Sequence, residues 1–337
     1  MDQVLIVHGV FALTEIKTLD LLNLIEGALG HFRAQGLGHR PEKADVQKAA
    51  FWFVQAELLR LPAFGIQMLL RDLERLDALG SASPSSVSNG APAALSIDAA
   101  GIPGHVALAL TVRLAGQAVK SQGAAILGIR QVGALGVLGC AARALAAEGA
   151  VAIISANSSA FVAPLGGSAA AIGTNPLAVA APRVNAAPLV LDYSTSPMTL
   201  AALRQARQNG GTLPASGAVD AGGQRTSDPA QAAALLPEGR ISSLTGLAIE
   251  IMTGVGVGGR TPAGTPAPER SALVIAYSPA AMGNQDVGPL CEQLAKDWGG
   301  AGGHVPGRFD GLPLEREQLP STMRIQSGTL AALRARL

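Results

Sequence analysis

The sequence is poor in charged and aromatic residues. Only 15% of its 337 residues are charged and 3% are aromatic, and 25 Lys and Arg against 24 Asp and Glu leave a formal net charge of +1. Without a basic surplus or aromatic stacking platforms, the composition argues against nucleic-acid binding. Hydrophobic residues make up 48% of the chain, which predicts a large core and a buried subunit interface.

Cysteine is also scarce. The sequence has two cysteines, Cys140 and Cys291, too few for a disulfide framework or a thiolate metal site, and this scarcity suits a reducing compartment. The first residues lack a basic region followed by an apolar run and a cleavage site. No run of about 18 residues is apolar without polar or Pro breaks, so we expect no transmembrane helix and no membrane partner. We therefore expect a cytoplasmic location.

Several common enzyme motifs are missing. The run GVGVGG at residues 254–259 follows an expected helix rather than a strand, so it is more typical of a flexible loop than of a Rossmann dinucleotide site. The sequence has no P-loop, GxSxG, HExxH or CxxC motif. Its histidines are scattered, with none at metal-ligand spacing from another, so we expect no metal site. These histidines are His8, His31, His39, His105 and His304.

The periodicity of apolar residues divides the chain in two. Helical spacing predicts three helices before a loop at residues 80–92, over residues 13–35, 41–61 and 63–79. Beyond that loop, expected helices alternate with short apolar strands. The helices are expected at 106–122, 134–149, 198–209, 247–254 and 287–298, and the strands at 124–129, 151–155, 189–193 and 273–277. This alternation predicts an α/β sheet domain behind a helical N-terminal segment.

The most informative stretch is rich in Gly, Asn, Ser and Pro. It contains Asn157-Ser158 and continues to the run GTNPLA at residues 173–178, followed by an apolar strand. By composition alone such residues only build turns between buried strands. Their order, followed by DYSTS at 192–196 and TSDP at 226–229, is more specific. With these motifs the sequence resembles the type 2 malate/L-lactate dehydrogenase family along nearly the whole chain. Asn157-Ser158 and TSPM at 195–198 are most similar to its Δ1-piperideine-2-carboxylate or cyclic ketimine reductase branch.

The resemblance implies a non-Rossmann α/β fold with a helical N-terminal subdomain and a mixed-sheet cofactor domain. We expect residues 1–80 to form the helical subdomain, residues 93–255 the cofactor-binding domain, and residues 256–337 a C-terminal segment that returns to the helical subdomain. It also implies a homodimer, with NADPH or NADH bound near the subunit interface, and a small substrate that carries a carboxylate.

The family motifs carry site residues over to this chain. Arg60, before Leu61-Pro62, is the implied partner of the substrate carboxylate, and Thr174 and Asn175 are implied beside substrate and cofactor. An arginine at a helix end that only covers apolar surface is the alternative for Arg60. The implied cofactor-binding residues are Ala134, Leu135, Gly136, Asp192, Tyr193, Ser194, Thr195, Ser196, Ser242, Ser243, Pro306, Gly307 and Arg308. For the residues of DYSTS, capping of a strand end is the alternative, and for Arg308 a solvated surface position.

The chain departs from the family at its proton relay. The family's Ser-His-Gly positions hold Gln55, Ala56 and Glu57, and the position of the orienting aspartate is Ala202. Glu57 and His105 are the replacement acids that the sequence offers, although an exposed helix glutamate and a histidine at a helix N-terminus are the more ordinary interpretations.

Two functions follow from this loss. The first is NAD(P)H-dependent reduction of a small carboxylated imine or a related 2-oxo acid, because an iminium arrives already protonated and needs no side-chain acid. The second is a catalytically silent or repurposed member that acts as a binding or scaffold subunit, or in non-redox chemistry on an imine or amino acid.

Overall fold

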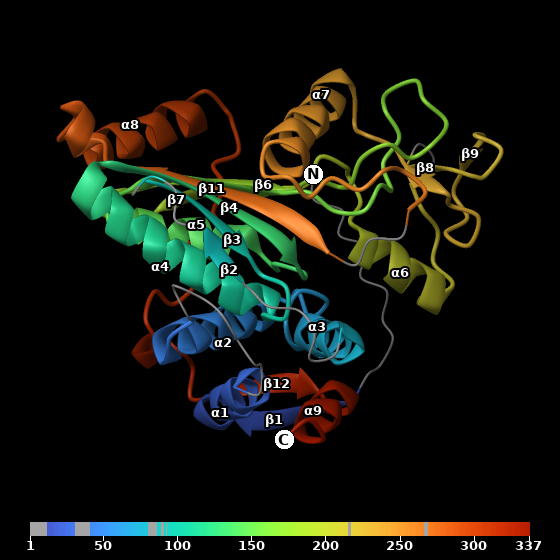
Figure 1. Ribbon diagram of the computed structural model, residues 1–337, viewed down its shortest axis with the longest axis horizontal. Coiled ribbons are helices and arrows are strands. Elements are labelled where there is room, and N and C mark those ends of the chain that lie inside the picture. Colours follow the sequence, from blue (N-terminus) through green and yellow to red (C-terminus); the bar gives the residue numbers. More distant parts are fainter. Residues whose placement is uncertain are drawn as a thin grey trace.

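The computed structural model describes residues 12–30, 41–79, 86–88, 91, 93–214, 217–265 and 269–337. At its centre lies a sheet of seven strands in the order β2-β3-β4-β11-β5-β6-β7 (Figure 1). These strands are β2 (Ser86–Ser88), β3 (Ala94–Asp98), β4 (Ala124–Val132), β5 (Val151–Ala156), β6 (Leu177–Ala181), β7 (Leu189–Tyr193) and β11 (Arg270–Tyr277). β3 and β4 are parallel, whereas the other neighbouring strands pair antiparallel. The sheet is therefore mixed, as the resemblance implied.

One face of the sheet is covered by α4 (Gly104–Gln122) and α5 (Leu138–Ala147). α4 is apolar nearly all round because it lies between the sheet and α2 (Lys43–Leu58), which packs on its outer side. The opposite face carries α7 (Arg240–Ile249), continued by the π-helical turn η2 (Glu250–Val255), and α8 (Val287–Gly300) (Figure 1). The two faces are therefore covered unequally.

The N-terminal layer is completed by the end of the chain. α1 (Thr18–Leu29) and α3 (Ile66–Leu79) lie beside α9 (Ser327–Arg334), and α2 packs on both α1 and α3. β1 (Leu13–Lys17) pairs antiparallel with β12 (Thr322–Gln326). The C-terminal segment thus packs against the N-terminal helices, while the domain boundaries themselves stay a prediction. The predicted helix from residue 13 is wrong in its first turn, because pairing with a distant strand makes residues 13–17 extended.

A smaller lobe holds β8 (Ala218–Val219), β9 (Arg225–Thr226), β10 (Ala234–Leu235) and α6 (Leu200–Asn209). Its small core is formed by Val162, Leu203, Leu213, Ala218, Ala232 and Leu235. The Gly210 C-cap ends α6 in the left-handed region, where glycine meets little steric penalty. This lobe places α6 toward the side of the molecule where α3 lies (Figure 1).

The remaining expectations concern a helix boundary, membrane-spanning helices and metal sites. The helix expected from residue 134 begins only at Leu138, because Gly133 and Gly136 keep residues 133–137 in a loop. Within the described ranges, no helix is long and apolar enough to cross a membrane, and no group of His, Cys, Asp and Glu could hold a metal ion. His8, His31 and His39 lie outside the described residues, as does most of the 80–92 loop.

Candidate active site

The GTNP and DYSTS motifs meet at one edge of the sheet. β6 pairs antiparallel with β7, so the residues before β6 lie beside the residues after β7. The hydroxyls of Ser194 and Thr195 both donate to the Thr174 carbonyl, at 2.9 and 3.0 Å, and the Thr195 amide donates to it at 3.1 Å. The structure therefore brings these predicted substrate and cofactor residues together.

The first half of α7 joins this junction. The Ser242 hydroxyl donates to the Thr195 carbonyl, and the Ser243 hydroxyl accepts from the Leu165 amide at 3.1 Å. α7 comes this close because of Gly246, where a Cβ atom would lie 3.1 Å from the Thr195 hydroxyl. Ser242 and Ser243, which were predicted from a different motif, thus belong to the same group as Thr195.

Asn175 lies at the buried centre of the junction. It is fully buried with φ of 32°, and its amide nitrogen donates at 3.0 Å both to the Gly246 carbonyl and to Oε2 of Glu250. A non-glycine residue at positive φ is uncommon and is retained where surrounding contacts require it. Asn175 is therefore held by α7 and η2 on one side and by β6 on the other.

Glu250 is a site residue that the sequence analysis missed. Its buried carboxylate accepts from Asn175 and, at 3.4 Å, from the Asn157 amide, and it lies 3.8 Å from Nε of Arg260. Buried carboxylates need such partners because desolvation is costly. In the sequence, Glu250 could have been identified because it is the single acidic residue in the apolar stretch at 247–254. It sits in a π-helical turn, a feature that is frequent at functional sites.

Two buried oxygen atoms lie unpaired at the junction, among the residues that the structure describes. Within the described part of the chain, Ser158 Oγ and Asn175 Oδ1 have no hydrogen-bond partner. Both lie against Gly173, where a Cβ atom would come within 2.3 and 2.8 Å of them. Buried polar atoms are normally paired, so two unpaired oxygens beside a glycine fit a polar group of a bound molecule.

A second group of predicted cofactor residues forms around Asp192. Its Oδ2 accepts from the Gly139 amide at 2.9 Å, in the first turn of α5, just after the loop of Ala134, Leu135 and Gly136. Burial raises the pKa of Asp192, while the hydrogen bond from Gly139 and the positive charge of Arg308 lower it. The effect of Arg308 on Asp192 places this exposed arginine, which follows Pro306 and Gly307, near the end of β7. Tyr193, the last residue of β7, is exposed.

Arg60 lies in the turn between α2 and α3. It is exposed and has φ of 58°, and the turn is closed by the Leu61 amide, which donates to the Ala56 carbonyl at 2.9 Å. Ala56, which the sequence resemblance assigns to the family's histidine position, is buried, whereas Ala202, which it assigns to the aspartate position, is exposed on α6. Neither alanine can carry a proton.

Glu57 connects the two helices on either side of this turn. Its Oε1 accepts from the amide of Ile66, the first residue of α3, at 2.8 Å. Burial raises the pKa of Glu57, and this hydrogen bond lowers it. Gly65 leaves room for the carboxylate, because a Cβ atom there would lie 2.3 Å from Oε1. Glu57 therefore satisfies a free amide at a helix N-terminus.

His105 occupies a fully enclosed position at the start of α4. Its ring stacks on Phe53 with centroids 3.7 Å apart and an interplanar angle of 26°. Burial lowers its pKa to about 3, against a smaller opposite effect of a hydrogen bond to the Ala134 backbone. The ring is therefore neutral at neutral pH, so it carries no imidazolium proton there.

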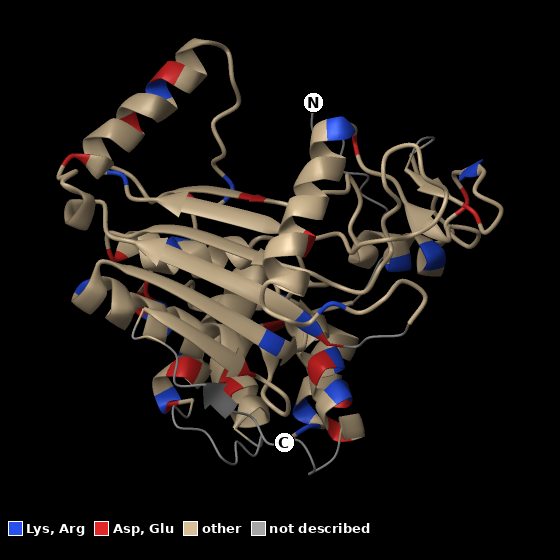
Figure 2. Cartoon of the chain, turned by 45° about the horizontal axis from the view of Figure 1, so that its top comes forward, with Lys and Arg blue, Asp and Glu red and all other residues tan. Residues whose placement is uncertain are grey.

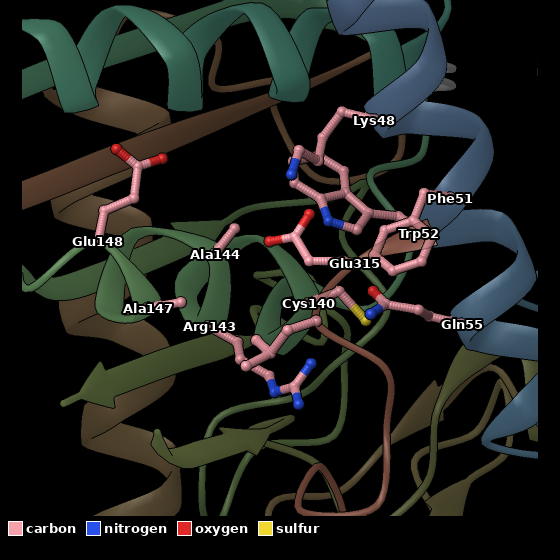
Figure 3. Close-up of a pocket in the computed structure, with 11 residues that line it drawn as sticks. Lys48, Phe51, Trp52, Gln55, Cys140, Arg143, Ala144, Ala147, Glu148 and Glu315 are labelled. Carbon is pink, nitrogen blue, oxygen red and sulfur yellow. The ribbon is translucent and has the colours of Figure 1, made fainter. Parts of the chain in front are cut away.

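A cavity of about 110 Å³ lies elsewhere, between α2, α5 and residues 314–315 (Figure 3). Gln55 reaches this side, where its amide donates to the Pro313 carbonyl at 2.8 Å. Arg143, also at the cavity, donates to the carbonyls of Leu312 and Pro313 at 2.6 and 3.0 Å. Small-molecule sites typically have volumes of about 300–1,000 Å³. This cavity is smaller, and the hydrogen bonds of Gln55 and Arg143 beside it hold the 312–315 segment in place.

Comparisons with known proteins agree with the resemblance seen in the sequence. Residues 31–301 match the family model described as malate/L-lactate dehydrogenase. A Δ1-pyrroline-2-carboxylate reductase of Agrobacterium fabrum is 30% identical over 230 residues, which are 65% of this chain and 67% of the relative. A Δ1-pyrroline-2-carboxylate/Δ1-piperideine-2-carboxylate reductase of Pseudomonas aeruginosa is 28% identical over 303 residues, 86% of this chain and 87% of the relative.

The fold is also shared with solved structures. The crystal structure of a Δ1-piperideine-2-carboxylate reductase from Pseudomonas syringae has a TM-score of 0.81 and 25% identity, covering 96% of this chain and 100% of that chain. This agreement extends over both the N-terminal helices and the mixed sheet. The predicted fold is therefore confirmed, and the protein belongs to the malate/L-lactate dehydrogenase family of oxidoreductases.

Proposed function

We propose that the protein is a nicotinamide-dependent reductase, using NADPH or NADH, of a small carboxylated imine of the cyclic ketimine type. One observation carries this proposal. Thr174, Asn175 and Thr195 meet at one junction, whereas the positions that the resemblance assigns to the family's acid–base relay hold Ala56 and Ala202, which have no titratable side chain. Named relatives that reduce pyrroline and piperideine carboxylates support the same substrate class.

The substrate is either an imine, reduced at its C=N bond, or a 2-oxo acid, reduced at its C=O bond. The chemistry of these two bonds decides between the substrate classes. Hydride addition to a ketone creates an alkoxide, and a proton donor contributes about 10²–10⁴-fold to such a step. Hydride addition to an iminium leaves a neutral amine, which needs no donor. Glu57 is held by the α3 amide and His105 is neutral and enclosed, so neither is poised to give a proton. An imine is therefore the better substrate for these residues.

The chain's own groups fit a nicotinamide cofactor. When bound, the cofactor supplies the hydride. Ser158 Oγ and Asn175 Oδ1 are unpaired among the described residues and offer hydrogen bonds to a carboxamide, and Arg308 offers a positive charge to phosphate. The loop of Ala134, Leu135 and Gly136 leads into the first turn of α5, beside Asp192. On the substrate side, the exposed Arg60 presents a guanidinium fork that suits a planar carboxylate.

A homodimer belongs to the same proposal. α7 and η2 expose an apolar stripe at helical spacing, with Ile241 77% and Val255 60% exposed, and α8 exposes a second one. The stripes consist of Ile241, Leu244, Leu247, Ile251 and Val255 on α7 and η2, and of Leu290, Leu294 and Trp298 on α8. Between them lies a sheet face with few charged residues (Figure 2). Contiguous apolar surface of this kind favours a second copy as partner.

The experiment is a titration of the purified chain with NADPH and with NADH, followed by steady-state kinetics. Micromolar binding of either cofactor, with kcat/KM at least 100-fold higher for Δ1-piperideine-2-carboxylate than for pyruvate, is the expected result. Arg60→Gln should raise KM for the imine at least tenfold, while Arg225→Gln, at an exposed arginine of β9, should leave it unchanged.

A second candidate, a silent binding or scaffold subunit, is favoured by the joint absence of Ser, His and Asp from the relay positions. For a silent subunit we expect no binding of NADPH or NADH at millimolar concentration. That result would contradict the reductase proposal and support the silent subunit.

A further inference from the structure

Two buried asparagine side chains are arranged around the carboxylate of Glu250. Its Oε2 accepts from Nδ2 of Asn175 at 3.0 Å, and its Oε1 accepts from Nδ2 of Asn157 at 3.4 Å. Nδ2 of Asn175 also donates to the Gly246 carbonyl at 3.0 Å. Oδ1 of Asn157 accepts from the Ser271 amide at 2.7 Å. Both asparagines therefore turn their nitrogen atoms toward one carboxylate.

These partners fix the orientation of the Asn175 amide. A carbonyl and a carboxylate only accept hydrogen bonds, so Asn175 has to present its nitrogen to Gly246 and Glu250. Its Oδ1 then lies on the other side, against the backbone of Gly173. Asn175 thus presents an acceptor rather than a donor at Gly173.

A second unpaired acceptor lies at the same point. Asn175 Oδ1 and Ser158 Oγ are buried and have no hydrogen-bond partner among the described residues. A Cβ atom at Gly173 would lie 2.8 Å from the first oxygen and 2.3 Å from the second, so both surround one point beside this glycine. Buried acceptors are normally paired. A primary carboxamide has two N–H donors and matches both oxygens, whereas an iminium nitrogen with one N–H matches only one of them.

We propose that Glu250 is a positioning residue for the nicotinamide cofactor. It holds the Asn175 amide with Oδ1 toward Gly173, where Oδ1 and Ser158 Oγ accept from the NH2 group of the nicotinamide carboxamide. Because the carboxamide is attached to the ring that carries the hydride, holding its NH2 group fixes the orientation of that ring. Glu250 itself touches no reacting atom. This inference rests on the proposed function, since it concerns the cofactor of that same site.

The test compares two dinucleotides that differ only in this NH2 group. The full-length protein is titrated by calorimetry, without substrate, with NADPH or NADH, whichever binds more tightly. It is then titrated with the reduced 3-acetylpyridine analogue of the same cofactor, in which a methyl group replaces the NH2 group. We expect the wild type to bind the analogue about tenfold more weakly, since two buried acceptors then stay unpaired.

Glu250→Gln is the variant expected to turn the Asn175 amide. Glutamine offers one acceptor atom where glutamate offers two. Nε of Arg260, a donor, lies 3.8 Å from Oε1, so it favours the glutamine oxygen on that side and leaves the glutamine NH2 group facing Asn175. Asn175 then turns its Oδ1 toward the glutamine and away from Gly173. We expect the preference for the carboxamide to fall to about threefold or less. Glu317→Gln, at an exposed glutamate of the C-terminal segment, is the matched control and should keep the wild-type preference.

Equal affinity of the wild type for the two dinucleotides would overturn the proposal, whether or not the variant folds. A preference that stays unchanged in folded Glu250→Gln would overturn it too, because a purely structural role weakens both dinucleotides equally. Binding of neither NADPH nor NADH to the wild type would contradict the reductase and this proposal with it. Binding without the preference leaves the reductase and removes only the role of Glu250, so the two failures are distinguishable.

Discussion

At the residue scale, Glu57 shows how a carboxylate next to a position expected to be catalytic can instead have a structural role. Its hydrogen bond to the Ile66 amide begins α3. We expect Glu57→Ala to lower the free energy of unfolding by about 1–2 kcal/mol, since it leaves this amide unpaired, and Glu57→Gln to lower it less. Urea denaturation measures both. Glu57→Gln should also keep kcat within about threefold. A fall of a hundredfold or more, with the fold intact, would instead identify Glu57 as the proton donor.

His105 makes the stability of the protein depend on pH. Because its folded pKa is about 3 and its unfolded pKa about 6.5, the unfolded chain binds the proton between these values. Stability is therefore present above the unfolded pKa and lost as the pH falls. This residue alone should cost about 2 kcal/mol between pH 7 and pH 5.

The matched variant is His105→Phe, which keeps a ring against Phe53 and removes the titration. Its free energy of unfolding should fall about 2 kcal/mol less than that of the wild type over the same pH interval. Equal losses in the two proteins, measured by urea denaturation, would show that the buried imidazole does not control the acid sensitivity.

At the scale of elements, the loop after β4 is fitted closely to α3. A Cβ atom at Gly133 would lie 1.9 Å from Oδ1 of Asp72 and 2.8 Å from Nε of Arg75. Gly133→Ala should therefore separate the Asp72–Arg75 pair and destabilise the fold by about 1–3 kcal/mol. Gly328→Ala on α9, where nothing lies within 4 Å, is the control and should be neutral or slightly stabilising. Thermal unfolding of the two variants compares them, and equal melting temperatures would contradict this account.

A comparison of predicted and observed helices and strands shows which of them depend only on the local sequence. α2, α4 and α8 lie close to the ranges predicted from the local sequence. β1 was predicted as helix because its extended form depends on β12, at the other end of the chain. Local pattern carries no information about such a partner.

The same distinction holds for the site. Thr174, Asn175 and Thr195 belong to contiguous motifs whose order was informative, and the sheet then brings them together. Glu250 comes from a separate segment and belongs to no motif. Only the folding of η2 against the start of β6 brings it to Asn175, so it could not be predicted from spacing.

At the scale of the whole molecule, the unequal cover of the sheet is the feature with the largest consequence. The face under α4 and α5 is closed, whereas the opposite face is covered only by α7 and α8 among the described elements (Figure 1). The strands expose apolar side chains such as Ile126, Leu191 and Tyr193. Exposing this apolar surface to water is unfavourable, and only 15% of the residues of the chain are charged. Association of two copies through this face would bury it.

The dimer can be tested with charges placed on the stripe of α7 and η2. We expect the wild type to have twice the 34.0 kDa mass of the chain in sedimentation equilibrium, and the double variant Leu247→Glu, Ile251→Glu to have the mass of one chain. Both side chains are about half exposed, so the variant should keep its circular dichroism spectrum. Leu19→Glu, at an exposed leucine of α1 on the far side of the molecule, is the control and should stay dimeric (Figure 1). A monomeric wild type, or a double variant that still sediments as a dimer, would contradict this interface. Because the junction of Ser242 and Thr195 lies beneath the same helix, loss of the dimer should also weaken cofactor binding.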